Sequence, residues 1–249
     1  MTLAPFCTTG KPAGQLSIGR FRVRLEQELA AFRAEFERTA PSGRAELYSA
    51  KVEELRRQFP LNDTLAVGDE APDFTLPNTR RRQVSLTSVL RAGPAIVTFY
   101  RGGWCPYCNI QLRAYQRALP KIAGLGGQIL AISPQLPDGS LSVSEKNALE
   151  FDVLGDAGNV VGRSFGLVYA LPGELRAVLR LNGKALPGIN GDESWELPVP
   201  ATFVIGQDRR VALAYVDVDY RRRLSPEDII ATLRSLPAPI APQAVTSMR

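Results

Sequence analysis

Two cysteines separated by two residues are the part of this sequence best suited to chemistry. Cys105 and Cys108 stand in the stretch Trp104-Cys-Pro-Tyr-Cys108, after the apolar run 95–100 and before a segment with helical periodicity. A strand followed by a helix brings both thiols to the first helical turn, where unpaired N–H groups and the positive dipole end favour thiolate. Lowering a cysteine pKa from about 8.5 to about 7 raises the thiolate fraction at neutral pH more than tenfold. The pattern therefore predicts thiol redox chemistry.

The composition excludes most competing chemistries. The chain contains no histidine, which removes Ser-His-Asp and Cys-His catalysis and the commonest transition-metal ligand. Its three cysteines, Cys7, Cys105 and Cys108, are one short of a four-ligand zinc site and too few for a disulfide scaffold. We therefore expect no metal and no cofactor, and a reducing cytoplasm in which the Cys105/Cys108 pair cycles. Cys7 is interpreted as a free thiol.

The positive charge does not by itself indicate a nucleic-acid partner. The net charge is +5, and the basic clusters 80–82, 209–210 and 221–223 each lie beside a predicted turn or strand end. Apart from Tyr220, no aromatic side chain is interleaved with them, so we interpret them as solvated surface. No apolar run approaches the ~18 residues that a membrane span needs. We expect neither a nucleic-acid nor a membrane partner.

The elements that must position the cysteines divide the chain into four parts. Residues 1–15 are predicted to be a flexible start, and residues 237–249 a loose tail. Residues 16–60 form a predicted helical extension of two amphipathic helices, broken at Pro41-Ser-Gly43 and ended by Pro60. We expect these helices to cap the main domain, to pair in a homodimer, or both.

The main domain is predicted over residues 65–236, with an α/β pattern. Short strands are expected within 68–76 and 83–86, a central buried strand at 95–100, and a helix after the cysteines. A second buried strand at 128–133 completes a βαβ unit, followed by a helix in 140–150 and a strand at 151–154. A hairpin of 201–205 with 211–216 precedes a final helix capped by Ser225. The segment 171–197 gives turn signals only.

This order of elements, with Cys-x-x-Cys after the first central strand, resembles the thioredoxin fold. Val199-Pro-Ala-Thr202, just before a predicted strand, looks like the segment in which thioredoxin-like proteins carry a cis-proline facing the cysteines. The resemblance implies a central mixed sheet flanked by helices. It also implies that Pro200 is cis and lies opposite the cysteine pair.

A narrower resemblance is to peroxiredoxins of the alkyl hydroperoxide reductase and thiol-specific antioxidant type. Gly68–Leu76 resembles their opening, and Phe99–Asn109 looks like a bacterial subgroup that carries Cys-x-x-Cys. The strings 131–135 and 195–202 and the N-terminal helical pair are similar to that subgroup too. The resemblance covers residues 16–236 and implies that Cys108 reacts with peroxide while Cys105 resolves the product.

Two positions depart from the ordinary peroxiredoxin pattern. Cys105 stands where these proteins place a threonine that hydrogen-bonds the peroxide. Pro200 stands where they place an arginine that stabilises the thiolate. Arg101, seven residues before Cys108, is the candidate for that positive charge, with a surface position as the alternative. Trp104 joins Arg101 and Pro200 as a candidate supporting residue.

Three functions follow, and the motif alone does not choose among them. The resemblance favours a peroxidase that reduces hydrogen peroxide or organic hydroperoxides, with a thioredoxin-, glutaredoxin- or small-thiol-type reductant. The missing threonine and arginine favour a protein disulfide reductase in which Cys105 is the nucleophile and Cys108 resolves the mixed disulfide. The third hypothesis is a thioredoxin-fold binding module with no catalysis.

Overall fold

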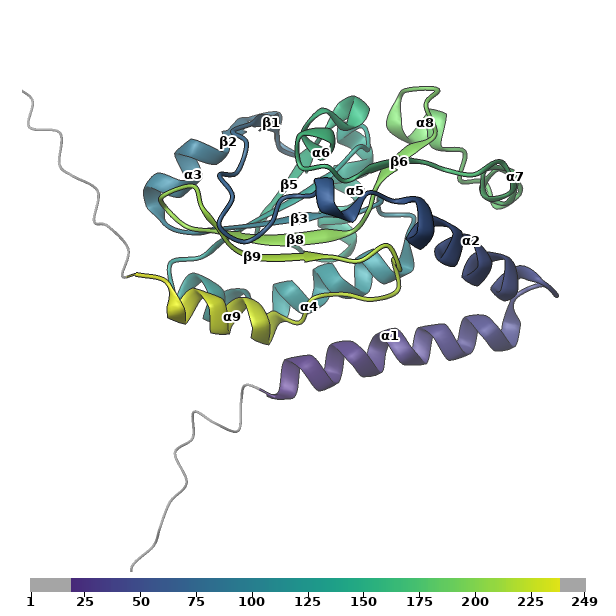
Figure 1. Cartoon of the computed structure of the whole chain (residues 1–249), viewed down its shortest axis with the longest axis horizontal. Helices are drawn as coiled ribbons and strands as arrows, with labels where there is room; N and C mark the ends of the chain where they lie inside the picture. Colours follow the sequence, from purple (N-terminus) through teal and green to yellow (C-terminus); the bar gives the residue numbers. More distant parts are fainter. Residues whose placement is uncertain (1–18, 238–249) are drawn as a thin grey trace, which may run out of the picture.

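The computed structural model describes residues 19–237, which form a mixed sheet with helices on both faces (Figure 1). The strands of the sheet follow the order β5-β4-β3-β8-β9. Their bounds are β3 Ala95–Phe99, β4 Gln128–Ser133, β5 Asp152–Gly155, β8 Ala201–Ile205 and β9 Val211–Val216. The pairs β3–β4 and β4–β5 are parallel, whereas β8 is antiparallel to both β3 and β9. The predicted βαβ unit and hairpin are confirmed.

Strand β3 lies at the centre of the sheet because both of its faces are covered. All of its residues are buried. Ile96 belongs to the core on the face of α4 and α9, whereas Val97 and Phe99 belong to the core on the opposite face. This split follows from the alternation of side chains along a strand. Residues 100–105 follow the carboxyl end of this central strand and lead into the start of α4.

Helices α4 (Pro106–Ala123) and α9 (Pro226–Ser235) cover one face of the sheet (Figure 1). The predicted stripe of α4 is confirmed, with Leu112, Tyr115 and Ile122 fully buried. The predicted cap of α9 is present as well, because the Ser225 hydroxyl accepts a hydrogen bond from the Asp228 N–H at 3.3 Å. The start of α9, which follows the loop after β9, is thus fixed by a cap.

Short elements cover the other face. They are β1 (Thr75–Pro77), β2 (Gln83–Ser85), α3 (Leu86–Ala92) and α6 (Val160–Ser164), with the 3-10 turns Leu61–Asp63 and Ala157–Asn159. The aromatic rings of Phe99, Phe165 and Phe203 pack together beneath them. The prediction that Leu86 ends a strand is wrong. Leu86 begins α3, since the Ser85 hydroxyl accepts a hydrogen bond from the Ser88 N–H and caps a helix there.

The segment between β4 and β8 differs most from the sequence prediction. Helix α5 spans Pro137–Lys146, earlier than the predicted 140–150, because Pro137 occupies its first turn. Beyond it lie β6 (Val168–Ala170), α7 (Gly173–Leu181), α8 (Leu186–Asn190) and β7 (Glu196–Pro198). Strands β6 and β7 pair antiparallel to each other. This pairing holds α7 out beyond one end of the main sheet (Figure 1).

The two predicted N-terminal helices are present, and they form a hairpin. Helix α1 (Gly19–Thr39) and helix α2 (Arg44–Gln58) are joined at Pro41-Ser-Gly43, where Gly43 has φ 75. Helix α1 lies against α4 and α9, while α2 runs toward α7 (Figure 1). No helix within residues 19–237 has the length and apolar character needed to cross a bilayer. The predicted flexible start with Cys7 and the tail after Pro237 lie outside the described residues.

Candidate active site

Cys105 and Cys108 lie on the first turn of α4, as the sequence predicted. Cys105 is the N-cap residue, Pro106 occupies the first helical position, and Cys108 follows two residues later. Both are free thiols, 2% and 0% exposed respectively. Pro106 lacks an N–H, so the free amides of this turn come from the residues after it and point toward the sulfur atoms. The helix start therefore offers positive potential to two buried thiols.

Arg223 supplies a cationic hydrogen bond to Cys108. Its Nη2 donates to the Cys108 Sγ at 3.4 Å from the loop between β9 and α9. The interpretation of residues 221–223 as solvated surface is therefore wrong for this member. The three arginines have different partners. Arg221 pairs with Asp219 at 2.7 Å, whereas Arg222 has an exposed side chain 3.7 Å from Asp217. Tyr220, the lone aromatic beside the run, was the available signal that part of it turns inward.

Arg101 is buried beside the cysteines rather than at the surface. It is 6% exposed, and its guanidinium lies 4.1 Å from the Tyr220 ring centre and 4.9 Å from that of Trp104. These cation–π contacts hold the charge next to α4 without a carboxylate partner. Its Nε has no hydrogen-bond partner among the described residues. Because no carboxylate pairs with Arg101, an anion in this site, such as a thiolate, can serve as its counter-ion.

The electrostatics separate the two thiols. Burial opposes ionisation of Cys105, but the hydrogen bond from Cys108 and the charges of Arg101 and Arg223 outweigh it and lower the pKa of Cys105 to about 5. For Cys108, burial together with the neighbouring Cys105 raises the pKa well above its ordinary value. At neutral pH the pair therefore consists of a Cys105 thiolate and a Cys108 thiol.

A chain of amide contacts fixes the loop before the helix. The Gly103 N–H donates to Gln135 Oε1 at 2.7 Å, and Asn109 Nδ2 donates to the carbonyl oxygens of Gly103 at 2.8 Å and Cys105 at 3.0 Å. Gly102 has φ 133, and a Cβ there would lie 2.6 Å from the Trp104 indole nitrogen. Asn109 and Gln135 occur in the strings used for the family resemblance, but nothing local in the sequence marks their roles.

A second network fixes the loop that carries Arg223. The Tyr115 hydroxyl donates to the carbonyl oxygen of Leu224 at 3.2 Å and lies 3.2 Å from the Thr202 hydroxyl oxygen. Tyr115 is fully buried on α4, and Thr202 lies on β8. The sequence predicted Tyr115 only as an apolar stripe residue. Its hydroxyl instead ties the backbone next to Arg223 to the helix that carries both cysteines.

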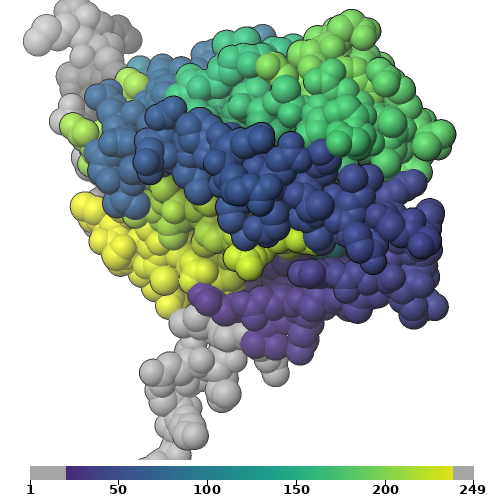
Figure 2. Space-filling model, turned by 45° about the vertical axis from the view of Figure 1, so that its right-hand side comes forward, coloured from purple at the N-terminus to yellow at the C-terminus, as the bar shows by residue number. Residues whose placement is uncertain are grey.

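A cavity of about 260 Å³ opens onto Cys105. Arg101, Trp104, Cys105 and Tyr107 border it at the sheet end, whereas Cys108 does not border it. Its remaining walls come from α1, α2, the segment 169–184, and Val218 and Tyr220 of the loop after β9. Figure 2 shows these parts meeting on one face, with purple α1 and blue α2 beneath the green segment of α7. A molecule in the cavity therefore meets the Cys105 sulfur first.

The expectation for Pro200 is wrong in its peptide geometry. Residues 19–237 contain no cis peptide bond, so the Val199–Pro200 bond is trans. The chain passes here from the β6–β7 pair directly into β8, with the Val199 N–H donating to the Leu167 carbonyl oxygen at 2.8 Å. A trans bond keeps this connection extended, so that Ala201 pairs opposite Phe99 in the sheet. Pro200 is buried but does not border the cavity.

No group of potential metal ligands accompanies the thiols. Within residues 19–237, no three side chains of the histidine, cysteine, aspartate and glutamate types gather closely enough to hold an ion. The charged side chains nearest to the sulfur atoms are arginines, which repel a cation. The positive charges of Arg101 and Arg223 favour an anionic sulfur.

A dithiol on a helix start, at the end of the central strand of a mixed sheet, is the arrangement of the thioredoxin-fold class. The model of the AhpC/TSA family matches residues 67–214, and the chain belongs to that family. The predicted resemblance is confirmed. The matched residues include both cysteines and Arg101 but leave out α1, α2 and Arg223.

Curated relatives and a solved structure agree with this assignment. The chain is 29% identical over 140 residues to the chloroplastic peroxiredoxin Q of Gentiana triflora, covering 55% of this chain and 61% of that protein. It is 33% identical over 103 residues to the putative peroxiredoxin bcp of Haemophilus influenzae, covering 41% and 66%. The chain thus spans less than two thirds of either relative. The crystal structure of peroxidoxin BcpB from Mycobacterium tuberculosis has a similar fold, with TM-score 0.55, 21% identity and coverage of 70% of this chain and 99% of that one.

Proposed function

We propose that this protein is a thiol-dependent peroxidase that reduces hydrogen peroxide or organic hydroperoxides through a Cys105/Cys108 dithiol–disulfide cycle. Membership of the AhpC/TSA family supports this activity. The observation that carries it is the burial of both sulfur atoms beneath a cavity of about 260 Å³. A small peroxide fits into this space, whereas a disulfide on the surface of a folded protein does not reach the sulfur atoms.

The cycle has two oxidative steps. A cysteine thiolate attacks the terminal peroxide oxygen, the S–O bond forms, the O–O bond breaks, and the leaving alkoxide takes a proton and departs as alcohol. The attacking sulfur is now a sulfenic acid. The second cysteine attacks that sulfur, and the S–S bond forms as the hydroxyl leaves as water after protonation. Each turnover oxidises the pair by two electrons and reduces one peroxide.

The order of attack is where this chain departs from the family pattern. The resemblance assigns the peroxide to Cys108, but Cys105 has the lowered pKa and borders the cavity. Because the thiolate is the nucleophile, we assign the first attack to Cys105 and the resolving step to Cys108. Arg101 stabilises the Cys105 thiolate, and Arg223 holds Cys108 and lowers the cost of its ionisation when it resolves.

Single-cysteine variants test both the activity and the order. Cys108→Ser is expected to form one equivalent of sulfenic acid at Cys105 with peroxide and then to stop. Cys105→Ser is expected to lose peroxide consumption and sulfenic acid formation together. Mass spectrometry after dimedone labelling reads both outcomes. Dimedone on Cys108 in Cys105→Ser would restore the family order, and the absence of any labelling in all proteins would refute the peroxidase.

The second candidate is a protein disulfide reductase, which the N-cap position and lowered pKa of Cys105 favour. In that reaction Cys105 attacks a partner disulfide and Cys108 releases the mixed disulfide. It requires α1 and α2 to move away from the cavity. Stable mixed disulfides between Cys108→Ser and insulin, formed faster than sulfenic acid with peroxide, would favour this function.

The reductant and the setting belong to the same proposal. A thioredoxin-, glutaredoxin- or small-thiol-type donor returns the disulfide to the dithiol, in a reducing compartment such as the cytoplasm. Comparing the reduction rates of the oxidised protein by dithiol proteins and by glutathione identifies the donor. We further propose that the chain forms a homodimer, which light scattering of the purified protein tests directly.

A further inference from the structure

Part of the wall of the cavity over Cys105 comes from elements that lie outside the family-matched residues. Helices α1 and α2 end before residue 67, where the match begins. They supply Phe32, Phe36, Tyr48, Val52 and Leu55 to the cavity wall. The extension is therefore part of the site and not only a cap on the domain.

The wall is mainly apolar and aromatic away from the cysteine. Leu175 and Leu179 of α7 also line the cavity. The charged and amide side chains of the lining are Arg101 beside Cys105 and, away from it, Lys51, Glu54 and Gln58 of α2 with Asn182 and Lys184 after α7. A ligand that buries apolar surface against this wall therefore gains the most binding free energy.

The size of the cavity exceeds what hydrogen peroxide needs. A water molecule takes about 30 Å³ of liquid volume, and hydrogen peroxide is only slightly larger. The cavity of about 260 Å³ leaves most of its apolar wall without contact when hydrogen peroxide is bound. An organic group the size of an aromatic ring with short substituents fills this space.

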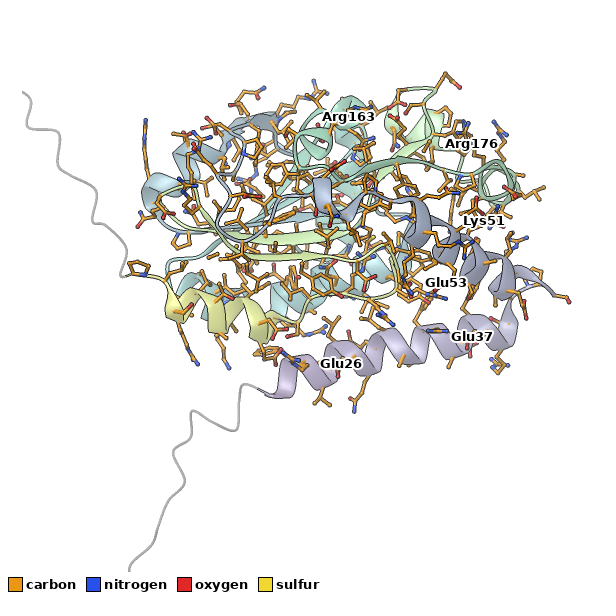
Figure 3. The ribbon with its side chains drawn as sticks, in the orientation of Figure 1. Glu26, Glu37, Lys51, Glu53, Arg163 and Arg176 are labelled. Carbon is orange, nitrogen blue, oxygen red and sulfur yellow. The ribbon has the colours of Figure 1, made fainter. Side chains whose placement is uncertain are left out.

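Specific contacts hold the helices in place over the cavity. Lys51 of α2 pairs with Glu174 of α7 at 2.6 Å, and Figure 3 labels Lys51 on the side of α2 toward α7. The rings of Phe36 and Tyr48 stack at 5.6 Å and join α1 to α2. Phe32 of α1 packs edge-on against Tyr107 of α4 at 5.0 Å. The wall is thus tied to the helix that carries the cysteines.

We propose that α1 and α2 make this site selective for an organic hydroperoxide with a bulky apolar body. The body lies against the wall formed with Leu175, and the peroxide group meets the Cys105 thiolate beside Arg101. This inference rests on the proposed peroxidase function and follows the same two-electron step, with the bulky alcohol as leaving group. Hydrogen peroxide reacts at the same sulfur but gains no binding free energy from contact with the apolar wall.

A charge placed in the apolar wall tests the proposal. Leu175→Asp introduces a carboxylate into the cavity, and Leu181→Asp places the same group on the same helix at a position that is 81% exposed. The wild type is expected to show a kcat/KM for cumene hydroperoxide at least about tenfold above that for hydrogen peroxide. Leu175→Asp is expected to lower the value for cumene hydroperoxide about tenfold more than the value for hydrogen peroxide. Leu181→Asp is expected to change neither.

A binding measurement that needs no turnover accompanies the kinetics. The chain has two tryptophans, so Trp195→Phe leaves Trp104, which borders the cavity, as the only indole. Cumyl alcohol, the product, is expected to change the Trp104 fluorescence in a saturable way. Adding Leu175→Asp to this variant is expected to weaken the binding about tenfold.

The outcomes separate this inference from the proposed function. If the wild type consumes no peroxide, the peroxidase and the substrate assignment fall together, whether or not the alcohol binds. If peroxides are consumed but hydrogen peroxide is preferred, or both substrates slow equally in Leu175→Asp, only the selectivity falls. A slower reduction of the oxidised variant by a small thiol, with both peroxides unaffected, would assign the cavity to the reductant and overturn the inference.

Discussion

Cys105 and Cys108 share one turn of α4, yet their surroundings differ in access and in charge. Cys105 borders a cavity, lies near the Arg101 guanidinium and has a pKa of about 5. Cys108 is fully enclosed, accepts a hydrogen bond from Arg223 and has a raised pKa. Two buried thiols this close do not both ionise at neutral pH, because the second thiolate meets the charge of the first. The difference teaches that one sulfur of the pair is prepared for attack and the other for resolution.

The largest expected effect is the difference in reactivity between the two sulfur atoms. Because thiolate increases as pH rises through the pKa, alkylation of Cys105 is expected to reach half its maximum near pH 5. An ordinary thiol with pKa about 8.5 is less than about 1% ionised at pH 6. At that pH, iodoacetamide is therefore expected to modify Cys105 about a hundredfold faster than Cys108, as read by peptide mass spectrometry in Cys7→Ser. If Cys108 were modified first, Cys108 and not Cys105 would be the more reactive thiol.

Removing the charge beside Cys105 is expected to have the next largest effect. Arg101→Met keeps an apolar chain over Trp104 and Tyr220 but loses the cation, which raises the Cys105 pKa by about two units. At pH 6 the thiolate fraction, and with it the rate of alkylation, falls about tenfold. Arg101→Lys is the matched control and is expected to retain most of the rate. Equal losses in both variants would show that packing, rather than charge, sets the reactivity.

How far the sequence predicted this site depends on how local each feature is. The apolar run of β3 and the periodicity of α4 are local patterns, so they placed both cysteines correctly. Arg223 reaches Cys108 across 115 positions of sequence, and its contact depends on how the loop after β9 folds back over α4. No pattern within residues 221–223 distinguishes the inward arginine from its exposed neighbour.

The other differences have the same physical origin. The cavity forms where α1, α2 and the segment 169–184 meet the loops before α4 and after β9, so none of these segments predicts it alone. The short elements α7 and α8 contain too few turns for periodicity to identify them. The sequence Val199-Pro200 matched a family segment, but the bond before Pro200 is trans, and no local pattern of the sequence marks that difference.

A smaller effect is expected from Arg223, and its neighbour provides the control. Arg223→Gln removes a cation that lowers the pKa of both cysteines, so the pH for half-maximal alkylation of Cys105 is expected to rise by about one unit. Disulfide formation after peroxide treatment is expected to slow severalfold, because Cys108 ionises less readily. Arg222→Gln removes the same charge from a side chain that is 66% exposed and is expected to change neither. Identical alkylation profiles for the two variants would mean that Arg223, like Arg222, does not affect the thiols.

The smallest effect concerns the support behind Arg223. Tyr115→Phe removes the hydrogen bond to the Leu224 carbonyl oxygen and leaves the ring in the core, which is expected to cost about 1 kcal/mol of unfolding free energy. If this bond positions Arg223, the variant also shifts the Cys105 alkylation profile in the direction of Arg223→Gln, by a smaller amount. Combining the two substitutions separates the roles, because a positioning residue adds nothing once Arg223 is gone. An additive shift in the double variant would mean that Tyr115 acts on the thiols independently of Arg223. The difference in pKa between the two cysteines would then depend on Tyr115 as well as on Arg101 and Arg223.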